Sequence, residues 1–376
     1  MIGNVRPTIY VFPFLRLFGE PPVSPVGLAL HLRSFGIPNA ELRHLSSPSQ
    51  QKGLIFGIDT SHSAIQSKIN LNRTWKLSHQ SQIAVVGLGS MGYGIAQSCV
   101  RAGHKTYGFD IDKTAVDQFL TDGGALGALA DIAGTLDAAA IVVLNAAQTE
   151  EVMFGSEGIA PRMPKGSVIL ACATVPPDFA KQMESRCANL GVHYLDAPIS
   201  GGAVKAAEGK LSILASGTPA AFTAARPVLD ATAETVFKLD DSAGAGSAMK
   251  AVNQLLAGVH IAAMAEALTF GMTQGIAPEK FLEVISQCAG TSWMLENRAP
   301  HIVTGDYTPN SQVNIWPKDL GIVREISKSS QFDLPITSAA LNQFLAAAEM
   351  GLGHEDDAAV AKVYARAAGL TLPGET

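Results

Sequence analysis

Cysteine is scarce in this sequence, and neither cysteine nor histidine stands at a metal-binding spacing. The chain of 376 residues holds four cysteines, and it contains no C-x-x-C and no H-E-x-x-H pattern. Scattered cysteines argue against a disulfide framework or a zinc site and favour a reducing compartment. We therefore expect no bound metal.

Long apolar runs are also lacking. The longest one, residues 255–268, is interrupted by His260 and Glu266. A helix that spans a bilayer needs about 20 consecutive apolar residues. We therefore expect this run to lie in a buried core helix, and we predict no membrane partner.

Basic charge is concentrated at the beginning of the chain. Residues 1–79 hold eight Lys or Arg against three acidic residues, while the whole chain has a formal net charge of −6, so the remainder is acidic. Nucleic-acid binding depends on basic side chains that neutralise phosphates. We therefore expect no nucleic-acid partner.

Residues 1–79 are rich in Ser, Pro and Arg and show no sustained helical or strand period. Such a composition predicts an N-terminal extension that is disordered. One interpretation is an organellar transit peptide, which would direct the protein to the mitochondrion. The other is a leader outside the functional protein, which leaves a cytoplasmic enzyme. We expect the cytoplasm and keep the mitochondrion as the alternative.

Residues 80–243 alternate short apolar runs with helix-like stretches. Strands that alternate with helices are typical of βαβ units and a mostly parallel sheet. The pattern predicts a doubly wound, Rossmann-type domain of the α/β class. The expected strands are 83–87, 105–110, 139–144, 167–172, 192–197, 211–216 and 235–239.

Residues 244–376 carry no further strand signal. The pattern predicts a long connecting helix over about 245–273 and then an all-α C-terminal domain, with helices that begin near Pro278, Lys318 and Ile336. The acidic stretch "HEDDAA" (354–359) is expected to be a solvated helix start, because acidic side chains are favourable at a helix N-terminus.

The stretch "VVGLGSMGYG" places Gly87, Gly89 and Gly92 in G-x-G-x-x-G spacing between a predicted strand and a predicted helix. A turn without side chains lets a pyrophosphate reach backbone N–H groups at a helix N-terminus. Asp110 ends the next strand, where a carboxylate accepts hydrogen bonds from ribose hydroxyls and repels an extra 2′-phosphate. The pattern predicts an NAD site and favours NAD over NADP, although the neighbouring Asp112 is an alternative ribose ligand.

Lys250, Asn253 and Gln254 share one face of the predicted long helix, which is otherwise small and apolar. An ammonium buried in such surroundings is costly and tends to lose its proton. A lysine whose pKa is lowered toward neutrality can take the proton of a hydroxyl while hydride leaves the carbon. We predict Lys250 to be a general acid/base, with Asn253 and Gln254 orienting substrate oxygens. The alternative is a lysine that reaches solvent at the helix end.

The loop Ser200-Gly201-Gly202 follows another predicted strand. Its backbone N–H groups and hydroxyl suit a carboxylate, and the alternative is a flexible turn.

Between residues 83 and 362 the chain resembles the β-hydroxyacid dehydrogenases. The resemblance rests on four motifs in order along the chain: "GLGSMGYG", "DAPISGG", "GAGSAMKAVNQ" and "KDLG". It implies that Lys250 is the general acid/base and that the substrate carboxylate and hydroxyls are held by Ser200, Gly201, Gly202 and Asn253. Gln254, on the same helix face, completes the predicted substrate site. It also implies that Leu144, Asn145 and Thr174 line the nicotinamide side and that Lys318 reaches the cofactor. With the glycine turn, the predicted NAD site comprises Gly87, Leu88, Gly89, Ser90, Met91, Gly92, Asp110, Leu144, Asn145, Thr174 and Lys318.

Two positions depart from the usual pattern of this family. Most members have two consecutive asparagines after the lysine, whereas the second residue here is Gln254, and many have Leu-Pro where this chain has Leu144-Asn145. These departures suggest a four-carbon aldonate such as L-threonate as the substrate, oxidised with NAD to the 2-oxo acid. Enzymatic alternatives are the reduction of tartronate semialdehyde and the oxidation of 3-hydroxyisobutyrate.

The family also includes non-catalytic NAD-binding scaffolds that lack the lysine, and this chain retains it as Lys250. The long apolar helix and the Ala-rich C-terminal part favour a homodimer or homotetramer.

Overall fold

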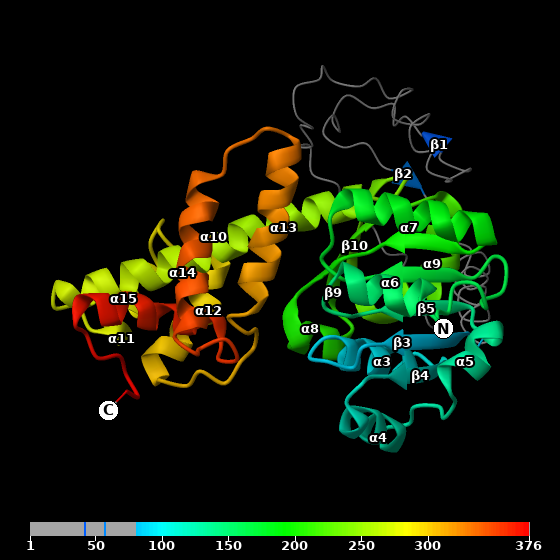
Figure 1. Ribbon diagram of the computed structural model, residues 1–376, viewed down its shortest axis with the longest axis horizontal. Coiled ribbons are helices and arrows are strands. Elements are labelled where there is room, and N and C mark those ends of the chain that lie inside the picture. The colour runs from blue at the N-terminus through cyan, green and yellow to red at the C-terminus, as the bar shows by residue number, and fades with distance from the viewer. Residues whose placement is uncertain (1–40, 43–55, 58–79, 376) are drawn as a thin grey trace, which may run out of the picture. The chain divides into compact units, whose positions relative to one another are not determined.

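The computed structural model describes residues 41–42, 56–57 and 80–375, and Figure 1 shows how their helices and strands are arranged. The predicted N-terminal extension falls almost entirely outside these residues. Two short strands, β1 (Glu41–Leu42) and β2 (Phe56–Gly57), pair antiparallel. Residues 80–376 form one compact unit.

The first half of this unit is built on one sheet, with the strand order β10-β9-β7-β6-β5-β3-β4. Strands β3 to β7 are parallel, whereas β9 pairs antiparallel with β7 and with β8. Strand β4 lies on one side of β3, and the chain then crosses to the other side of β3 to form β5. The strand order therefore reverses between β3 and β5, and ligands are expected at the carboxyl ends of β3 and β5. The strands are β3 (Gln82–Val86), β4 (Lys105–Phe109), β5 (Ala138–Ile141), β6 (Val168–Ala171), β7 (His193–Asp196), β8 (Ile199–Ser200), β9 (Leu211–Ser216) and β10 (Ala233–Asp240).

Both faces of the sheet are buried. In β3, the side chains of Ile83 and Val85 belong to one hydrophobic cluster, and the side chain of Ala84 belongs to another on the opposite face. Successive side chains of a strand point to opposite faces, so a strand buried on both sides reads as a continuous apolar run. Helices α3 and α9 contribute to the first cluster, and α6 and α7 to the second. The helices of this half are α3 (Gly92–Arg101), α4 (Lys113–Thr121), α5 (Leu129–Ile132), η1 (Ala133–Thr135), α6 (Ala146–Phe154), α7 (Pro177–Leu190), α8 (Gly202–Glu208) and α9 (Pro219–Thr232).

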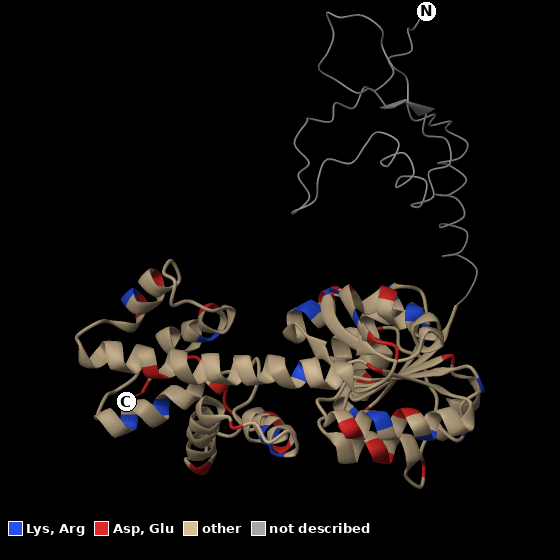
Figure 2. Ribbon diagram, turned by 90° about the horizontal axis from the view of Figure 1, so that it is seen from above, with Lys and Arg blue, Asp and Glu red and all other residues tan. Residues whose placement is uncertain are grey.

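The second half is helical and is organised around α10 (Ala245–Thr273), a single helix of 29 residues. By length and composition alone this helix could cross a membrane. It contacts α12, α13, α14 and α15, and its residues contribute to the core of the helical half, as predicted for a core helix. Lys250 and Glu266 are the two charged residues of α10, and most of its length is drawn in the colour of uncharged residues in Figure 2. The other elements are α11 (Pro278–Ile285), α12 (Trp293–Thr304), α13 (Ile315–Ser329), α14 (Pro335–Glu349), η2 (Asp357–Val360) and α15 (Ala361–Ala368).

The predicted fold class is therefore confirmed: a doubly wound α/β part, a long helix and an all-helical part (Figure 1). The predicted division into separate domains at residue 243 stays a prediction, because residues 80–376 cluster as one unit.

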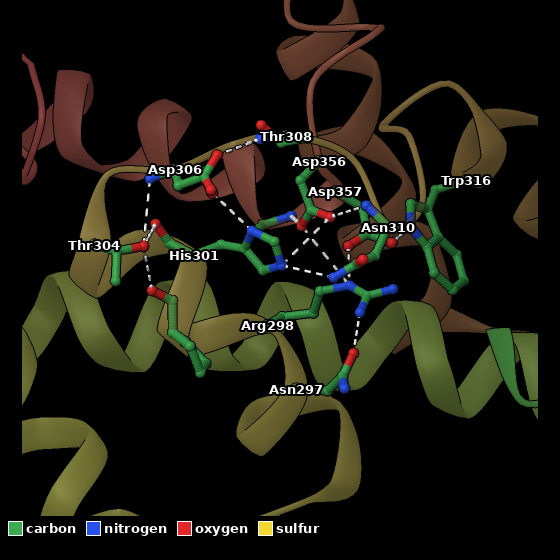
Figure 3. A network of polar contacts seen from close by, with 12 residues as sticks. Asn297, Arg298, His301, Thr304, Asp306, Thr308, Asn310, Trp316, Asp356 and Asp357 are labelled. Carbon is green, nitrogen blue, oxygen red and sulfur yellow. Dashed lines mark hydrogen bonds and ion pairs between the residues drawn. The ribbon is translucent and has the colours of Figure 1, made fainter. Parts of the chain in front are cut away.

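The prediction of a solvated helix start at residues 354–359 is wrong. Asp356 and Asp357 are completely buried. Figure 3 shows the polar network that surrounds them: Arg298 Nε lies 2.5 Å from Asp357 Oδ1, and Trp316 Nε1 donates to Asp357 Oδ2 at 2.9 Å. Asp356 accepts from the backbone N–H of Asn310 at 2.8 Å. Burial of these carboxylates is possible because the guanidinium from α12, the indole N–H from α13 and the backbone N–H of Asn310 in the loop between them replace their water.

Candidate active site

Three glycines shape the turn between β3 and α3, each for a different reason. Gly87 has φ +98°, a left-handed conformation that other residues rarely adopt, and a Cβ there would collide with the carbonyl oxygen of Val142. A Cβ on Gly92 would collide with the carbonyl oxygen of Gly87. A Cβ on Gly89 would have no atom within 4 Å, so this backbone faces open space. The turn therefore matches a pyrophosphate loop, with a tight turn, an accessible backbone and close packing of helix on strand.

Asp110 holds this turn in place. Its Oδ2 accepts a hydrogen bond from the backbone N–H of Leu88 at 2.6 Å, and its Oδ1 accepts one from the backbone N–H of Asp112 at 2.9 Å. Each carboxylate oxygen retains a further lone pair, so both bonds are compatible with the predicted contact to a ribose. Asp112 instead caps α4, because its side chain accepts from the backbone N–H of Thr114. The geometry favours Asp110 over Asp112 as the predicted ribose ligand.

The first turn of α10 is attached to the sheet by Asp196, the last residue of β7. Asp196 Oδ2 accepts from the backbone N–H groups of Gly244 and Ser247 at 2.9 and 2.8 Å, and Asp196 Oδ1 accepts from Ser247 Oγ at 2.7 Å. Ser216 Oγ donates to the same carboxylate at 3.1 Å. Burial raises the pKa of Asp196, and these hydrogen bonds oppose the shift. Two strand ends thus set the position of the helix that carries Lys250.

The amine of Lys250 is buried, with 9% of the residue exposed. Its Nζ donates to the backbone carbonyl of Ile199 at 2.9 Å, directly before the loop Ser200-Gly201-Gly202. Burial lowers the pKa of Lys250 to about 8, while the negative charge of Asp319 raises it and the positive charge of Lys318 lowers it. The alternative of an amine that reaches solvent does not match this placement.

Helix α13 brings Lys318 and Asp319 to the same place. Lys318 Nζ donates to the backbone carbonyl of Leu144 at 2.7 Å. The same Nζ lies 2.8 Å from Asp319 Oδ1 and forms an ion pair with it, although the angles are not those of a hydrogen bond. Asp319 Oδ2 accepts from Gln254 Nε2 at 2.5 Å, and Gln254 Oε1 accepts from Asn253 Nδ2 at 2.9 Å. Gln254 is therefore engaged by protein at both ends of its amide.

The structure brings most of the predicted residues together at the carboxyl edge of the sheet. Leu144 and Asn145 follow β5, and Val142 of the same segment contacts the glycine turn. Asn145 also caps α6, because its Oδ1 accepts from the backbone N–H of Gln148. Thr174 follows β6 and is buried. The loop residues Gly201 and Gly202 both have positive φ, as this turn requires. The individual roles of these residues, and those of Ser90 and Met91 in the glycine turn, stay predictions.

Sequence reasoning missed two acidic residues of this site. Asp196 stands in the motif "DAPISGG", at the carboxyl end of a predicted strand, which is a common position for functional residues. Asp319 stands beside Lys318, and no spacing links it to Gln254, 65 residues earlier. The first could have been found from its position, whereas the second needed the packing of α13 on α10.

Comparison with known proteins agrees with this geometry. The family model for the NAD binding domain of 6-phosphogluconate dehydrogenase matches residues 82–239, and the model for NAD-binding of NADP-dependent 3-hydroxyisobutyrate dehydrogenase matches residues 244–364. The chain is 45% identical over 294 residues to L-threonate dehydrogenase of Cupriavidus necator, covering 78% of this chain and 98% of that protein. It is 44% identical to L-threonate dehydrogenase of Escherichia coli K12, covering 80% and 99%.

Among solved structures, 3-hydroxyisobutyrate dehydrogenase from Salmonella typhimurium is 46% identical, with a TM-score of 0.72, covering 75% of this chain and 99% of that chain. Matches of this extent over nearly the whole length of the relatives include both the sheet and the helical half. The chain therefore belongs to the NAD-dependent β-hydroxyacid dehydrogenase family.

Proposed function

We propose that this enzyme oxidises L-threonate at C2 to the 2-oxo acid, with NAD as hydride acceptor and Lys250 as general base. The names of its 44–45% identical relatives support the substrate. The observation that carries the chemistry is the buried amine of Lys250, held 2.9 Å from the Ile199 carbonyl beside the predicted substrate loop.

Lys250 acts on the hydroxyl proton. At a pKa of about 8, roughly a tenth of the amine is unprotonated at pH 7, a far larger fraction than for a lysine with the ordinary pKa of 10.5. Its lone pair takes the proton of the C2 hydroxyl, and the electron pair of that O–H bond becomes the second bond of the new carbonyl while hydride leaves C2. A base whose pKa lies close to the working pH contributes about 10²–10⁴-fold to such a step.

Residues of the glycine turn and the neighbouring loops hold the cofactor. The turn suits a pyrophosphate because its backbone is accessible at Gly89 and because Gly87 and Gly92 have no room for a side chain. Asp110 suits the ribose. When bound, NAD supplies the hydride acceptor. Lys318, anchored on the Leu144 carbonyl, joins the helical half to this edge of the sheet and closes the site from that side.

The loop Ser200-Gly201-Gly202 holds the substrate carboxylate. It lies next to the Ile199 carbonyl that receives the Lys250 amine, so a carboxylate bound by its N–H groups and hydroxyl presents C2 toward Lys250. Asn253, one helical turn from Lys250, contacts the substrate on the side opposite the loop Ser200-Gly201-Gly202.

A kinetic panel tests the proposed substrate. We expect kcat/KM with NAD to be highest for L-threonate among L-threonate, glycerate and 3-hydroxyisobutyrate, where glycerate is the reduced partner of tartronate semialdehyde. The panel includes 3-hydroxyisobutyrate because the 46% identical solved structure from Salmonella typhimurium is named 3-hydroxyisobutyrate dehydrogenase. A higher value for any of the other compounds would replace L-threonate as the substrate.

Substitution of Gly89 tests the cofactor turn. A methyl group at Gly89 meets no protein atom, so we expect Gly89→Ala to keep its melting temperature. The same methyl group occupies the space through which a pyrophosphate approaches the backbone, and we expect the Kd for NADH to rise about tenfold or more in a fluorescence titration. Gly290→Ala, at another glycine with no atom within 4 Å of its Cβ position, is the matched control. Equal NADH affinity in both variants would refute this position of the cofactor.

Assembly and compartment form the less specific part of the proposal. We infer a homodimer or homotetramer in the cytoplasm, without membrane or nucleic-acid partners. Four exposed apolar side chains on α10 support burial against another subunit: Met249, Val252, Leu256 and Phe270. Light scattering measures the assembly, and a cleaved N-terminus in the native protein would favour the mitochondrial alternative instead.

A further inference from the structure

The side chains of Asp319, Gln254 and Asn253 form a relay with a fixed direction. An ionised carboxylate only accepts hydrogen bonds. Asp319 forms an ion pair with Lys318, whose Nζ lies 2.8 Å from Oδ1, and the Oδ2 of this carboxylate therefore requires the NH₂ end of Gln254. The oxygen of Gln254 then faces Asn253, so Asn253 must present its own NH₂ group there, as the 2.9 Å distance from Nδ2 to Oε1 shows.

Burial makes this direction stable. Asp319 is 2% exposed and Gln254 8% exposed, so water does not compete for either partner. If the amide of Gln254 were turned over, its oxygen would face a carboxylate oxygen. The relay engages the NH₂ end of the Asn253 amide, so the opposite end, the carbonyl Oδ1, is directed away from Gln254, on the face of α10 that also carries Lys250.

An oxygen at that place can only accept a hydrogen bond. It does not suit the substrate carboxylate, which has no proton to donate. It does not suit the reacting hydroxyl either, because the single proton of that group goes to Lys250 in the proposed reaction. A second hydroxyl of the substrate is the group that matches it.

We propose that Asp319, acting through Gln254, orients Asn253 so that its Oδ1 accepts a hydrogen bond from a hydroxyl on the carbon next to the reacting one, which makes these three residues a selector for polyhydroxylated acids. The inference rests on the proposed function and adds to it: the loop at Ser200 takes the carboxylate, and Asn253 takes the C3 hydroxyl. Asp319 and Gln254 are positioning residues in this assignment.

Two variants test the direction of the relay. Gln254→Lys offers only donors to its neighbours, so Asn253 must turn over and present its NH₂ group to the substrate. The double variant Gln254→Glu with Asp319→Asn keeps the charge of the pair. The carboxylate that it introduces accepts from both neighbours, so Asn253 keeps its original orientation and the double variant serves as the matched control.

The measurement is the ratio of kcat/KM for L-threonate to kcat/KM for 3-deoxy-3-fluoro-L-threonate, in which an acceptor of similar size replaces the donor. The electronic effect of fluorine on hydride transfer is common to all variants and cancels between them. We expect the double variant to keep the ratio of the unaltered enzyme and Gln254→Lys to lower it about tenfold, the value of one hydrogen bond. Absolute rates are not the readout, because Asp319 also acts on Lys250.

Gln254→Met removes the relay without adding charge and serves if Gln254→Lys does not fold. It lets Asn253 adopt both orientations, and we expect its ratio to fall as well. A ratio that is unchanged in Gln254→Lys and Gln254→Met overturns the inference alone. Failure of the unaltered enzyme to oxidise L-threonate overturns the proposed function, and the inference with it.

Discussion

Replacing Lys250 by methionine is expected to lower kcat by about 10²–10⁴-fold while the protein remains folded. Methionine fills a similar volume and suits the apolar surroundings of the side chain, so the melting temperature should stay close to that of the unaltered enzyme. The loss arises because the variant lacks the amine that takes the hydroxyl proton. Steady-state oxidation of L-threonate, with thermal unfolding of the same samples, measures both quantities.

Arginine at the same position separates the two possible uses of the Lys250 amine, as a positive charge and as a base. Lys250→Arg keeps the positive charge, but a guanidinium stays protonated at all working pH values and cannot act as a base. We expect Lys250→Arg to be as slow as Lys250→Met. A variant of either kind that retains turnover within tenfold of the unaltered enzyme would refute the role of Lys250 as base.

The pH profile follows from the lowered pKa of Lys250. Oxidation requires the unprotonated amine, so kcat/KM should rise with pH and level off above about 8. Asp319 raises the pKa of Lys250 and Lys318 lowers it, so Asp319→Asn should move the rise to lower pH. A profile that rises near the ordinary lysine value of 10.5 would show that the amine is solvated during the reaction.

The second large effect concerns stability. Arg298→Ala is expected to lower the free energy of unfolding by about 3–5 kcal/mol, because it leaves the buried Asp356 and Asp357 without their guanidinium (Figure 3). Chemical denaturation at pH 8 measures the loss. Arg226→Ala, which breaks an exposed pair with Asp230 on α9, is the matched control and should change stability little.

The loss should depend on pH. Burial raises the pKa of Asp357, and Arg298 opposes that shift. In Arg298→Ala the folded pKa of Asp357 is therefore higher still and lies above the unfolded value, so the folded state gains stability as pH falls and the carboxylate is protonated. We expect the difference from the unaltered protein to be smaller at pH 5 than at pH 8. A loss independent of pH would mean that lost packing, and not an uncompensated charge, is its cause.

Local patterns in the sequence were sufficient for the fold and for part of the site. Periodicity and glycine spacing predict the strands at 82–86 and 105–109, the turn with its three glycines and the helix at 245–273. The structure has each of these within a few residues of the prediction. The placement of Lys250 on one helical face with Asn253 and Gln254 needed only the 3.6-residue period.

Burial of polar groups could not be predicted in the same way. The stretch at 354–359 looks like a solvated helix start because its acids are local, whereas the guanidinium that permits their burial stands 59 residues earlier at Arg298. The same holds for Gln254, whose amide direction depends on Asp319, 65 residues later.

The sequence by itself thus determined the order of strands and helices, the glycine turn and the face of α10 that carries the amine, because these depend on neighbours along the chain. Only the tertiary structure decided which polar side chains are paired and in which direction they donate. A buried polar group is stable only with a partner of matching chemistry, and here those partners come from strands and helices far away in the sequence.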